Sequence, residues 1–354
     1  MAKKPLISIV IPCLNENRTI KRCIDNAYKN ARQFLGKRFE IIVADNGSTD
    51  GSLKILKRIK KITLVNVPVK GYGAALHWGI MKSKSKYVIF ADADLSYPFS
   101  NLNKFFSELQ KNPDIVLGSR FKGKIKKGSM PFLHRYLGTP VLTFLIRLLY
   151  KIPVSDCNSG MRMIKKSFYK KLNMRNSGME WASELLLKSA LKKGKYFEVP
   201  IMFNKDKRGK RPHLATWSDG WRHLKAIFLL KPKSIYPFVF LFSILGFVMW
   251  KFSFAFAFLF FNLAFVLILC LLALNFLSAT IENTHTKISK FLKEFKLVPI
   301  TGVVCILVGV AIILISDNHL GTKLFLVSIL GTIFMWIFLI ETIKTHITNR
   351  LPDL

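Results

Sequence analysis

The stretch YVIFADADLS, residues 87–96, decides the fold expected for this chain. It begins with a short apolar run, which is typical of a buried parallel strand. It ends on two aspartates, Asp92 and Asp94, placed one residue apart before a break at Tyr97 and Pro98. Carboxylates together with substrate phosphates are the usual ligands of Mg²⁺ or Mn²⁺. A solvated turn has the same local pattern, so the neighbouring segments must decide between the two.

Two earlier segments repeat this arrangement. The apolar run at residues 6–11 ends at Pro12 and is followed by Asn15 and Glu16, and the run at residues 39–44 ends at Asp45. Helices are expected at residues 19–35, at residues 53–60 and after Gly71, and further strands at residues 62–67 and 115–119. Alternating strands and helices predict a doubly wound α/β domain, whose ligands bind beyond the carboxyl ends of the strands. The polar residues should therefore meet at one edge of the sheet.

The composition points to a membrane. The 354 residues include 55 Lys and Arg against 20 Asp and Glu, a net charge of +35, yet 51% are hydrophobic. Such a chain suits nucleic acid or an anionic membrane surface. Four long apolar runs, at about residues 235–250, 253–279, 297–316 and 323–341, then favour the membrane, because about 20 apolar residues span a bilayer. We therefore expect an integral, multi-pass membrane protein and no nucleic-acid partner.

The loops between these runs predict the orientation. Lys287, Lys290, Lys293 and Lys296 lie between the second and third runs, whereas the other two loops are nearly neutral. The positive-inside rule then places the catalytic domain and both termini in the cytoplasm. The expected parts are a catalytic domain at residues 1–210, an amphipathic interface helix at 211–233 and a transmembrane region at 234–354. Residues 130–150 are also amphipathic, and fit either a membrane-surface helix or a helix on the flank of the domain.

Several segments resemble the inverting family 2 glycosyltransferases, which have the GT-A fold, a Rossmann-like doubly wound sheet. These segments are residues 9–16 (IVIPCLNE), residues 43–51 (VADNGSTDG) and the pair Asp92 and Asp94. Within that family the chain is most similar to polyprenyl-phosphate sugar transferases, such as dolichol-phosphate mannose and glucose synthases. This narrower similarity is carried by residues 71–75, 118–121, 156–162 and 198–201. It extends over roughly residues 6–230.

The resemblance implies a donor such as UDP-glucose or GDP-mannose and assigns roles to the polar residues. Asp92 and Asp94 would hold Mg²⁺ or Mn²⁺ and the diphosphate, and the expected catalytic residues are Asp94, Asp156 and Arg162. Asp156 acts either as a base or as an orienting group for Arg162 or a sugar hydroxyl. Further substrate-binding residues are expected near the nucleoside (Pro12, Asn15, Glu16, Asp45), on phosphates (Arg120, Arg135, Arg162) and in the basic loop 205–213 (Arg208, Lys210). That loop is either a lid over the phosphates or a solvated charge run that binds lipid headgroups.

The function expected from these features is the inverting transfer of one hexose from a nucleotide sugar to polyprenyl or dolichyl phosphate. The reaction would take place at the cytoplasmic face of the lipid bilayer. An alternative is a membrane glycosyltransferase that acts on another lipid or on a polysaccharide. A processive synthase usually carries a Gln-X-X-Arg-Trp motif, which this sequence lacks. A membrane anchor that only binds nucleotide is a third alternative, and the intact aspartate pair and arginine set disfavour it.

Overall fold

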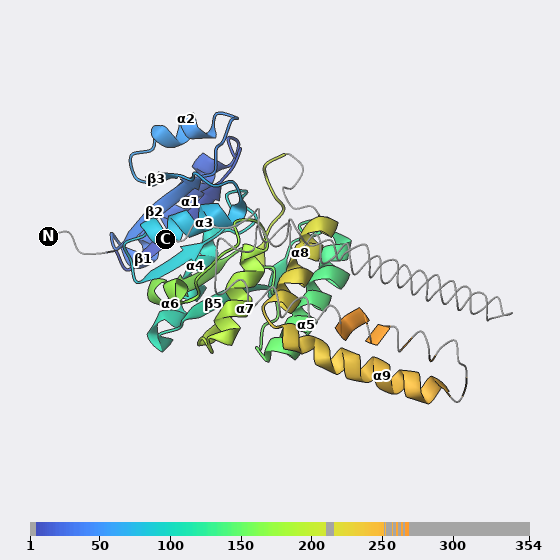
Figure 1. Ribbon diagram of the computed structural model, residues 1–354. Coiled ribbons are helices and arrows are strands. Elements are labelled where there is room, and N and C mark those ends of the chain that lie inside the picture. Colours follow the sequence, from blue (N-terminus) through green and yellow to red (C-terminus); the bar gives the residue numbers. More distant parts are fainter. Residues whose placement is uncertain are drawn as a thin grey trace, which may run out of the picture. The chain divides into compact units, whose positions relative to one another are not determined.

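The computed structural model describes residues 5–209 and 216–250, together with a few positions between 252 and 268 (Figure 1). Two compact units divide between Ile227 and Phe228, and the α/β sheet lies in the first unit. The second, third and fourth expected membrane spans lie outside the described residues, apart from those few positions in the second. Lys210 lies outside them as well.

The first unit is built on a seven-stranded sheet in the order β3-β2-β1-β4-β6-β5-β7 (Figure 1). The strands are β1 (Ile7–Cys13), β2 (Phe39–Asp45), β3 (Thr63–Asn66), β4 (Tyr87–Phe90), β5 (Ile115–Ile125), β6 (Arg162–Lys165) and β7 (Tyr196–Phe203). Strands β1 to β4 pair in parallel, β6 runs antiparallel to β4 and β5, and β7 is parallel to β5. Strand β5 is longer than expected, because its pairing with β7 resumes at Lys124 after an irregularity.

Helices connect the strands, as the sequence pattern predicts. They are α1 (Ile20–Leu35), α2 (Ser52–Lys57), α3 (Tyr72–Lys82), α4 (Leu102–Ser107), α5 (Thr139–Tyr150), α6 (Lys166–Lys171), α7 (Trp181–Leu191), α8 (Thr216–Leu229) and α9 (Tyr236–Trp250). Shorter turns are the 3₁₀ helices η1 (Phe99–Asn101), η2 (Glu108–Lys111) and η4 (Pro232–Ile235), and the π-helical turn η3 (His134–Gly138). Residues 130–150, expected to form one amphipathic helix, thus form η3 followed by α5.

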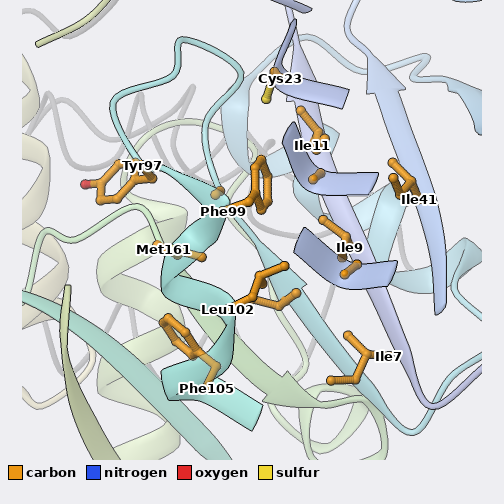
Figure 2. Close-up of a cluster of buried hydrophobic side chains, with 14 of the residues drawn as sticks. Ile7, Ile9, Ile11, Cys23, Ile41, Tyr97, Phe99, Leu102, Phe105 and Met161 are labelled. Atoms are coloured by element: carbon orange, nitrogen blue, oxygen red, sulfur yellow. The ribbon is translucent and has the colours of Figure 1, made fainter. Parts of the chain in front are cut away.

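Strand β1 is buried on both faces, which explains its nearly continuous apolar sequence. On one face Ile7, Ile9 and Ile11 pack with the buried side of α1 and with Phe99, Leu102 and Phe105 of η1 and α4 (Figure 2). Helix α3 covers the opposite face of β1 and β2. There the ring of Phe90 in β4 meets Trp181 of α7 edge to face, with ring centroids 5.5 Å apart. Packing on both faces of the sheet thus holds the carboxyl ends of its strands in place.

Helix α9 corresponds to the first expected membrane span, and α8 lies within the expected interface region. Among the described residues no single helix has the length and apolarity needed to cross a membrane. The stretch made of Arg222–Leu229 and Lys233–Met249 meets both criteria only when its two helical pieces are taken together across their break.

We expect the substitution Gly73→Ala to destabilise the first unit. A Cβ atom on Gly73 would lie 2.4 Å from Cβ of Trp181, so that α3 and α7 would have to move apart. The free energy of unfolding should fall by about 1–3 kcal/mol. Thermal unfolding of the full chain in detergent measures this, with Gly220→Ala in α8 as the matched control. Gly220 has no atom within 4 Å of its Cβ position, so this change should be neutral or slightly stabilising. Equal stability of both variants would contradict the packing described here.

Candidate active site

Four carboxylates gather at the carboxyl edge of the parallel strands. Cys13 at the end of β1 lies in register with Asp45 at the end of β2, and Val10 with Phe90, two residues before Asp92. The sheet therefore brings Glu16, Asp45 and the aspartate pair to one edge, as the sequence predicts. Glu16, Asp45 and Asp94 are buried. Carboxylates removed from water need hydrogen bonds or cations, and the contacts of each show how the site is built.

Asp45 is only half satisfied. Its Oδ2 accepts hydrogen bonds from the backbone N–H groups of Gly47 and Ser48, both at 3.2 Å. Its Oδ1 is buried and has no hydrogen-bond partner among the described residues. Leaving a buried acceptor unpaired costs about 1–3 kcal/mol. This oxygen therefore suits a hydrogen-bond donor on a ligand, such as the N–H group of a nucleobase.

Asn15 and Pro12, both expected to bind substrate, shape the loops beside Asp45. Oδ1 of Asn15 accepts from the backbone N–H of Thr49 at 2.7 Å, and the backbone N–H of Asn15 donates to Ser48 Oγ at 2.9 Å. Asn15 thereby ties the turn after β1 to the loop after β2. Pro12 is buried within β1 in register with Ala44. In the structure both residues position the backbone around Asp45.

Asp92 lies in a tight space beside the loop that precedes β6. Tyr72 at the start of α3 donates its hydroxyl to Asp92 Oδ1 at 2.9 Å. A Cβ on Gly160 would lie 2.6 Å from Asp92 Oδ2, so a larger residue at position 160 would press on the carboxylate. Burial first, and then the charge of Asp94, raise the pKa of Asp92 to about 6.

Asp94 is held by the turn that follows β4. Its Oδ1 accepts the backbone N–H of Ser96 at 2.8 Å. Leu95 between them has a φ of 67°, a left-handed conformation that a leucine rarely adopts. Such backbone strain is frequent at functional sites. The other carboxylate oxygen of Asp94, Oδ2, contacts a cation.

That cation is Arg208, in the loop that follows β7. Its Nη2 lies 3.3 Å from Asp94 Oδ2 and 2.6 Å from Asp206 Oδ2, and its Nη1 lies 3.3 Å from Glu16 Oε1. The three carboxylates raise the pKa of the guanidinium, against the effect of its burial. Burial raises the pKa of Glu16 to about 7 in spite of this partner. The loop also reaches the turn after β4, since the backbone N–H of Lys207 donates to the carbonyl of Asp94 at 3.1 Å.

The aspartate pair is a reasonable site for a divalent cation. Burial, and then the charge of Asp94, disfavour the ionised form of Asp92, and a cation beside the pair would favour it. The contact of Arg208 with Asp94 shows that a cation is accepted there. The described residues contain no cluster of three or more metal-ligating side chains. Two carboxylates are enough for Mg²⁺, which usually completes its coordination with waters and substrate phosphates.

Asp156 and Arg120 form a buried, bidentate ion pair. Nε of Arg120 donates to Asp156 Oδ2 and Nη2 donates to Oδ1, each at 2.7 Å, and the backbone N–H of Arg120 adds a third bond at 3.0 Å. The carboxylate of Asp156 is fully buried. Both of its oxygens are engaged by the guanidinium, so the carboxylate orients Arg120. The expectation was that Asp156 acts as a base or orients Arg162 or a sugar hydroxyl; in the structure its partner is Arg120, and its part in the reaction stays a prediction.

Arg162, expected at a phosphate, is engaged by backbone carbonyls in this structure. Its Nε, Nη1 and Nη2 donate to the backbone carbonyls of Ser159, Ala182 and Cys157, at 2.9, 2.6 and 2.8 Å. It is almost completely buried, and desolvation lowers the pKa of its guanidinium. Arg162 therefore holds the loop after Asp156 against α7, and its phosphate contact stays a prediction. Arg135 lies on η3 with its guanidinium over the ring of Tyr136.

Sequence reasoning missed four residues that support the site. These are Tyr72 and Asp206, described above, Tyr97, whose hydroxyl accepts from Gly160 N at 2.8 Å, and Glu198, which accepts from Ser155 N at 2.7 Å. Tyr72 and Glu198 fall in segments that carried the family resemblance, but nothing in the sequence showed their partners. Tyr72, Tyr97 and Glu198 act on residues more than ten positions away. Asp206 acts on its neighbour Arg208, whose contact with Asp94 exists only in the folded chain.

Residues 8–172 match the model of the family described as glycosyl transferase family 2. The α/β domain belongs to this family. The family expected from the sequence is thereby confirmed.

Several curated proteins are similar to this glycosyltransferase domain. A low-salt glycan biosynthesis hexosyltransferase, Agl6 of Haloferax volcanii, is 33% identical over 246 residues, which cover 69% of this chain and 56% of that protein. The dolichyl-phosphate beta-glucosyltransferase of Saccharomyces cerevisiae is 25% identical, over 56% of this chain and 66% of its own length. A UDP-N-acetylglucosamine–dolichyl-phosphate N-acetylglucosaminyltransferase of Methanococcus voltae is 29% identical, over 57% and 86%. The chain thus spans little more than half of the Haloferax relative.

A solved structure shares the fold of the domain. Glucosyl-3-phosphoglycerate synthase of Mycobacterium tuberculosis, in complex with Mn²⁺, UDP and glucosyl-3-phosphoglycerate, superimposes with a TM-score of 0.51 and 20% identity. The match covers 64% of this chain and 80% of the synthase. The GT-A fold expected from the sequence is confirmed for the glycosyltransferase domain.

The buried pair Arg120 and Asp156 gives a test of the site's construction. Asp156→Ala leaves a buried guanidinium without its carboxylate, so the free energy of unfolding should fall by about 3–5 kcal/mol. The double change Arg120→Met with Asp156→Leu removes both charges and should cost much less. Denaturant unfolding of the full chain measures both. A double variant less stable than Asp156→Ala would show that the pair does not have the role described here.

Proposed function

We propose that this protein transfers one hexose from a nucleotide sugar to polyprenyl or dolichyl phosphate, with inversion at the anomeric carbon. The observation that carries this proposal is the meeting of the half-satisfied Asp45 with Asp92 and Asp94 at one sheet edge. The acceptor is inferred from the two relatives whose names include dolichyl-phosphate. The donor is a uridine or guanosine diphosphate sugar, UDP-glucose or GDP-mannose being the candidates from the sequence.

The donor would extend along the sheet edge. Oδ1 of Asp45 accepts an N–H of the base, and Glu16 and the loop after β2 border the nucleoside. Asp92 and Asp94 would hold Mg²⁺ or Mn²⁺ together with the diphosphate. When bound, the metal supplies Lewis-acid stabilisation of the departing nucleoside diphosphate. Tyr72 and Gly160 keep Asp92 in place, and Ser96 N keeps Asp94 in place.

The acceptor phosphate needs positioning more than deprotonation, because a phosphomonoester is already anionic at neutral pH. One of its oxygens forms the bond to the anomeric carbon while the bond from that carbon to the diphosphate breaks. Attack from the opposite face inverts the centre. Arg120, oriented by Asp156, is the group proposed to meet the acceptor phosphate. This role needs no base, which agrees with the engagement of both Asp156 oxygens.

Arg208 is proposed to leave Asp94 when donor and metal bind. Its guanidinium pairs with Asp94, one of the two carboxylates that would hold the metal, and with Glu16 beside them, so we propose that its loop acts as a lid on the donor site. The location proposed for the whole protein is the membrane, as a multi-pass protein whose catalytic domain and both termini are cytoplasmic. The apolar runs and loop charges of the C-terminal third support it.

The decisive experiment supplies membranes that contain the protein with radiolabelled UDP-glucose, GDP-mannose and UDP-N-acetylglucosamine, one at a time. We expect one donor to give a labelled lipid that mild acid cleaves, as a sugar phosphodiester should. Thin-layer chromatography of the lipid extract measures it. Label in a soluble glycan or in protein, with none in lipid, would overturn the proposed acceptor.

In the same assay Asp94→Asn should reduce product by about 100-fold or more, because the metal and the leaving diphosphate lose a charged ligand. The chain should still enter the membrane fraction. The matched control is Asp25→Asn, which changes a surface carboxylate of α1 that pairs with Lys61. This variant should retain full activity. Retained activity in Asp94→Asn would remove Asp94 from the donor site.

Arg208→Gln should strengthen the binding of Mn²⁺ in the absence of nucleotide by about tenfold, or ~1.4 kcal/mol, because the competing cation is removed. Electron paramagnetic resonance of free Mn²⁺ measures it. Lys205→Gln, an exposed cation of the same loop, should change the affinity little. Weaker Mn²⁺ binding in Arg208→Gln would contradict the displacement of Arg208 by the metal.

A further inference from the structure

Arg120 lies where strand β5 leaves its regular pairing with β7. The pairing stops after Ser119 and resumes at Lys124, so that residues 120–123 lie opposite a single residue of β7, Ile201. Such an irregularity is a β-bulge, and bulges beside active sites frequently redirect a side chain. Because the residues of this bulge lie outside the regular pairing, contacts of side chains must hold them. These contacts therefore determine where Arg120 points.

One carboxylate, that of Glu198 on β7, contacts both sides of the ion pair between Arg120 and Asp156. Its Oε2 lies 2.6 Å from Nζ of Lys122, two residues after Arg120. Its Oε1 accepts the backbone N–H of Ser155 at 2.7 Å, and its Oε2 accepts the Ser155 hydroxyl at 3.0 Å. Ser155 directly precedes Asp156. Glu198 thus connects the segment that carries Arg120 to the segment that carries Asp156.

Two serine hydroxyls reinforce this connection. The hydroxyls of Ser119 and Ser155 lie 2.6 Å apart, and Ser119 Oγ accepts the backbone N–H of Lys122 at 3.1 Å. The side chain of Glu198 is 5% exposed, whereas that of Lys122 is 51% exposed and reaches the carboxylate from the surface. A carboxylate so far removed from water needs hydrogen bonds and a cation, and both oxygens of Glu198 have such partners.

We propose that Glu198 is a positioning residue for the transfer reaction. It holds the pair of Arg120 and Asp156 in the orientation at which the Arg120 guanidinium meets the acceptor phosphate. This role rests on the proposed function, because the contact of Arg120 with the acceptor belongs to that function. Glu198 itself touches neither substrate, and acts through Lys122 on one side and Ser155 on the other.

Orientation matters at this pair because a guanidinium binds a phosphate with a planar fork of N–H groups. Arg120 already uses Nε and Nη2 on Asp156, so the direction of its remaining N–H groups follows that of the carboxylate. Displacement of a positioned group by about 1 Å can lower a rate by about 100-fold. The contacts of Glu198 restrain the backbone on both sides of the pair, and thereby this direction.

Glutamine at position 198 tests this role, because it keeps the size of the side chain and replaces one oxygen by an NH₂ group. In either orientation of the amide, that group meets a donor. It faces the backbone N–H of Ser155 in one orientation and the ammonium group of Lys122 in the other. Glu198→Gln should therefore lose one contact and loosen the pair, while the sheet stays folded.

The experiment measures transfer of labelled sugar to polyprenyl phosphate by the full chain in membranes, with each substrate varied in turn. In Glu198→Gln we expect kcat/KM for the acceptor to fall by about tenfold or more. The KM of the nucleotide sugar should change little, because the aspartates of the donor site are held by other contacts. The matched control is Glu108→Gln, which changes a carboxylate of η2 that pairs with Lys111, and it should equal the parent chain.

A second background shows whether Glu198 acts through Arg120. Arg120→Lys keeps a positive charge but has no fork to orient. In this background Glu198→Gln should lower kcat/KM for the acceptor much less than in the parent chain, because effects that pass through one group are not additive.

Three kinetic results would overturn the positioning role. The first is a kcat/KM for the acceptor in Glu198→Gln equal to that in Glu108→Gln. The second is a rise in the KM of the nucleotide sugar as large as the loss with the acceptor, which would show a general disturbance of the domain. The third is the same fold loss in the Arg120→Lys background as in the parent chain.

A measurement without turnover separates this role from the proposed function. Hydrogen–deuterium exchange of the full chain in detergent should become faster in Glu198→Gln in peptides that contain Arg120, whose backbone N–H donates to Asp156. Exchange in β1 and β2 should stay as in the parent chain. Unchanged exchange at Arg120 would overturn the positioning role, whereas a parent chain that forms no labelled lipid would overturn the proposed function.

Discussion

The arrangement of the site depends on how the buried carboxylates at the carboxyl edge of the sheet are stabilised. Asp45, Asp92, Asp94 and Glu16 are brought together there by strand order, and burial raises the pKa of Asp92 and Glu16. Backbone N–H groups, one tyrosine hydroxyl and Arg208 stabilise these groups only in part. A site that keeps residual negative charge and one unpaired acceptor is prepared for a cation and a hydrogen-bond donor from outside the protein.

The loop between Asp156 and Arg162 joins the two sides of this site. At one end Asp156 forms an ion pair with Arg120. At the other end Arg162 donates hydrogen bonds both to carbonyls of the loop and to a carbonyl of α7. Between them Gly160 lies against Asp92, and the backbone of Cys157 is held by α5. A displacement of α5 should therefore also move the loop that contacts Asp92 and Arg120, the groups proposed to hold the donor diphosphate and the acceptor phosphate. These contacts explain why Arg162 is almost fully buried there.

The sequence predicted the fold and the edge at which the site lies, but fewer of the individual roles. Strand ends are visible in sequence because apolar runs stop at polar turns, and parallel strands bring those ends together. The partner of each charged group is not visible in this way. Asp156 was expected to serve as a base or to orient Arg162 or a sugar hydroxyl, and the sequence did not show its ion pair with Arg120, 36 positions away. Asn15 was expected on the ligand, and the sequence did not show that it also holds Thr49.

By itself the sequence determined the α/β sheet, the family, the acidic edge and the amphipathic character of residues 130–150. Periodicity and turn chemistry are local, so one chain suffices to show them. Only the tertiary structure decided which charges neutralise one another, which oxygen of Asp45 is left unpaired and which side of α5 is already covered. The physical reason is that burial and ion pairing depend on distances between residues far apart along the chain, and these exist only once the layers have packed.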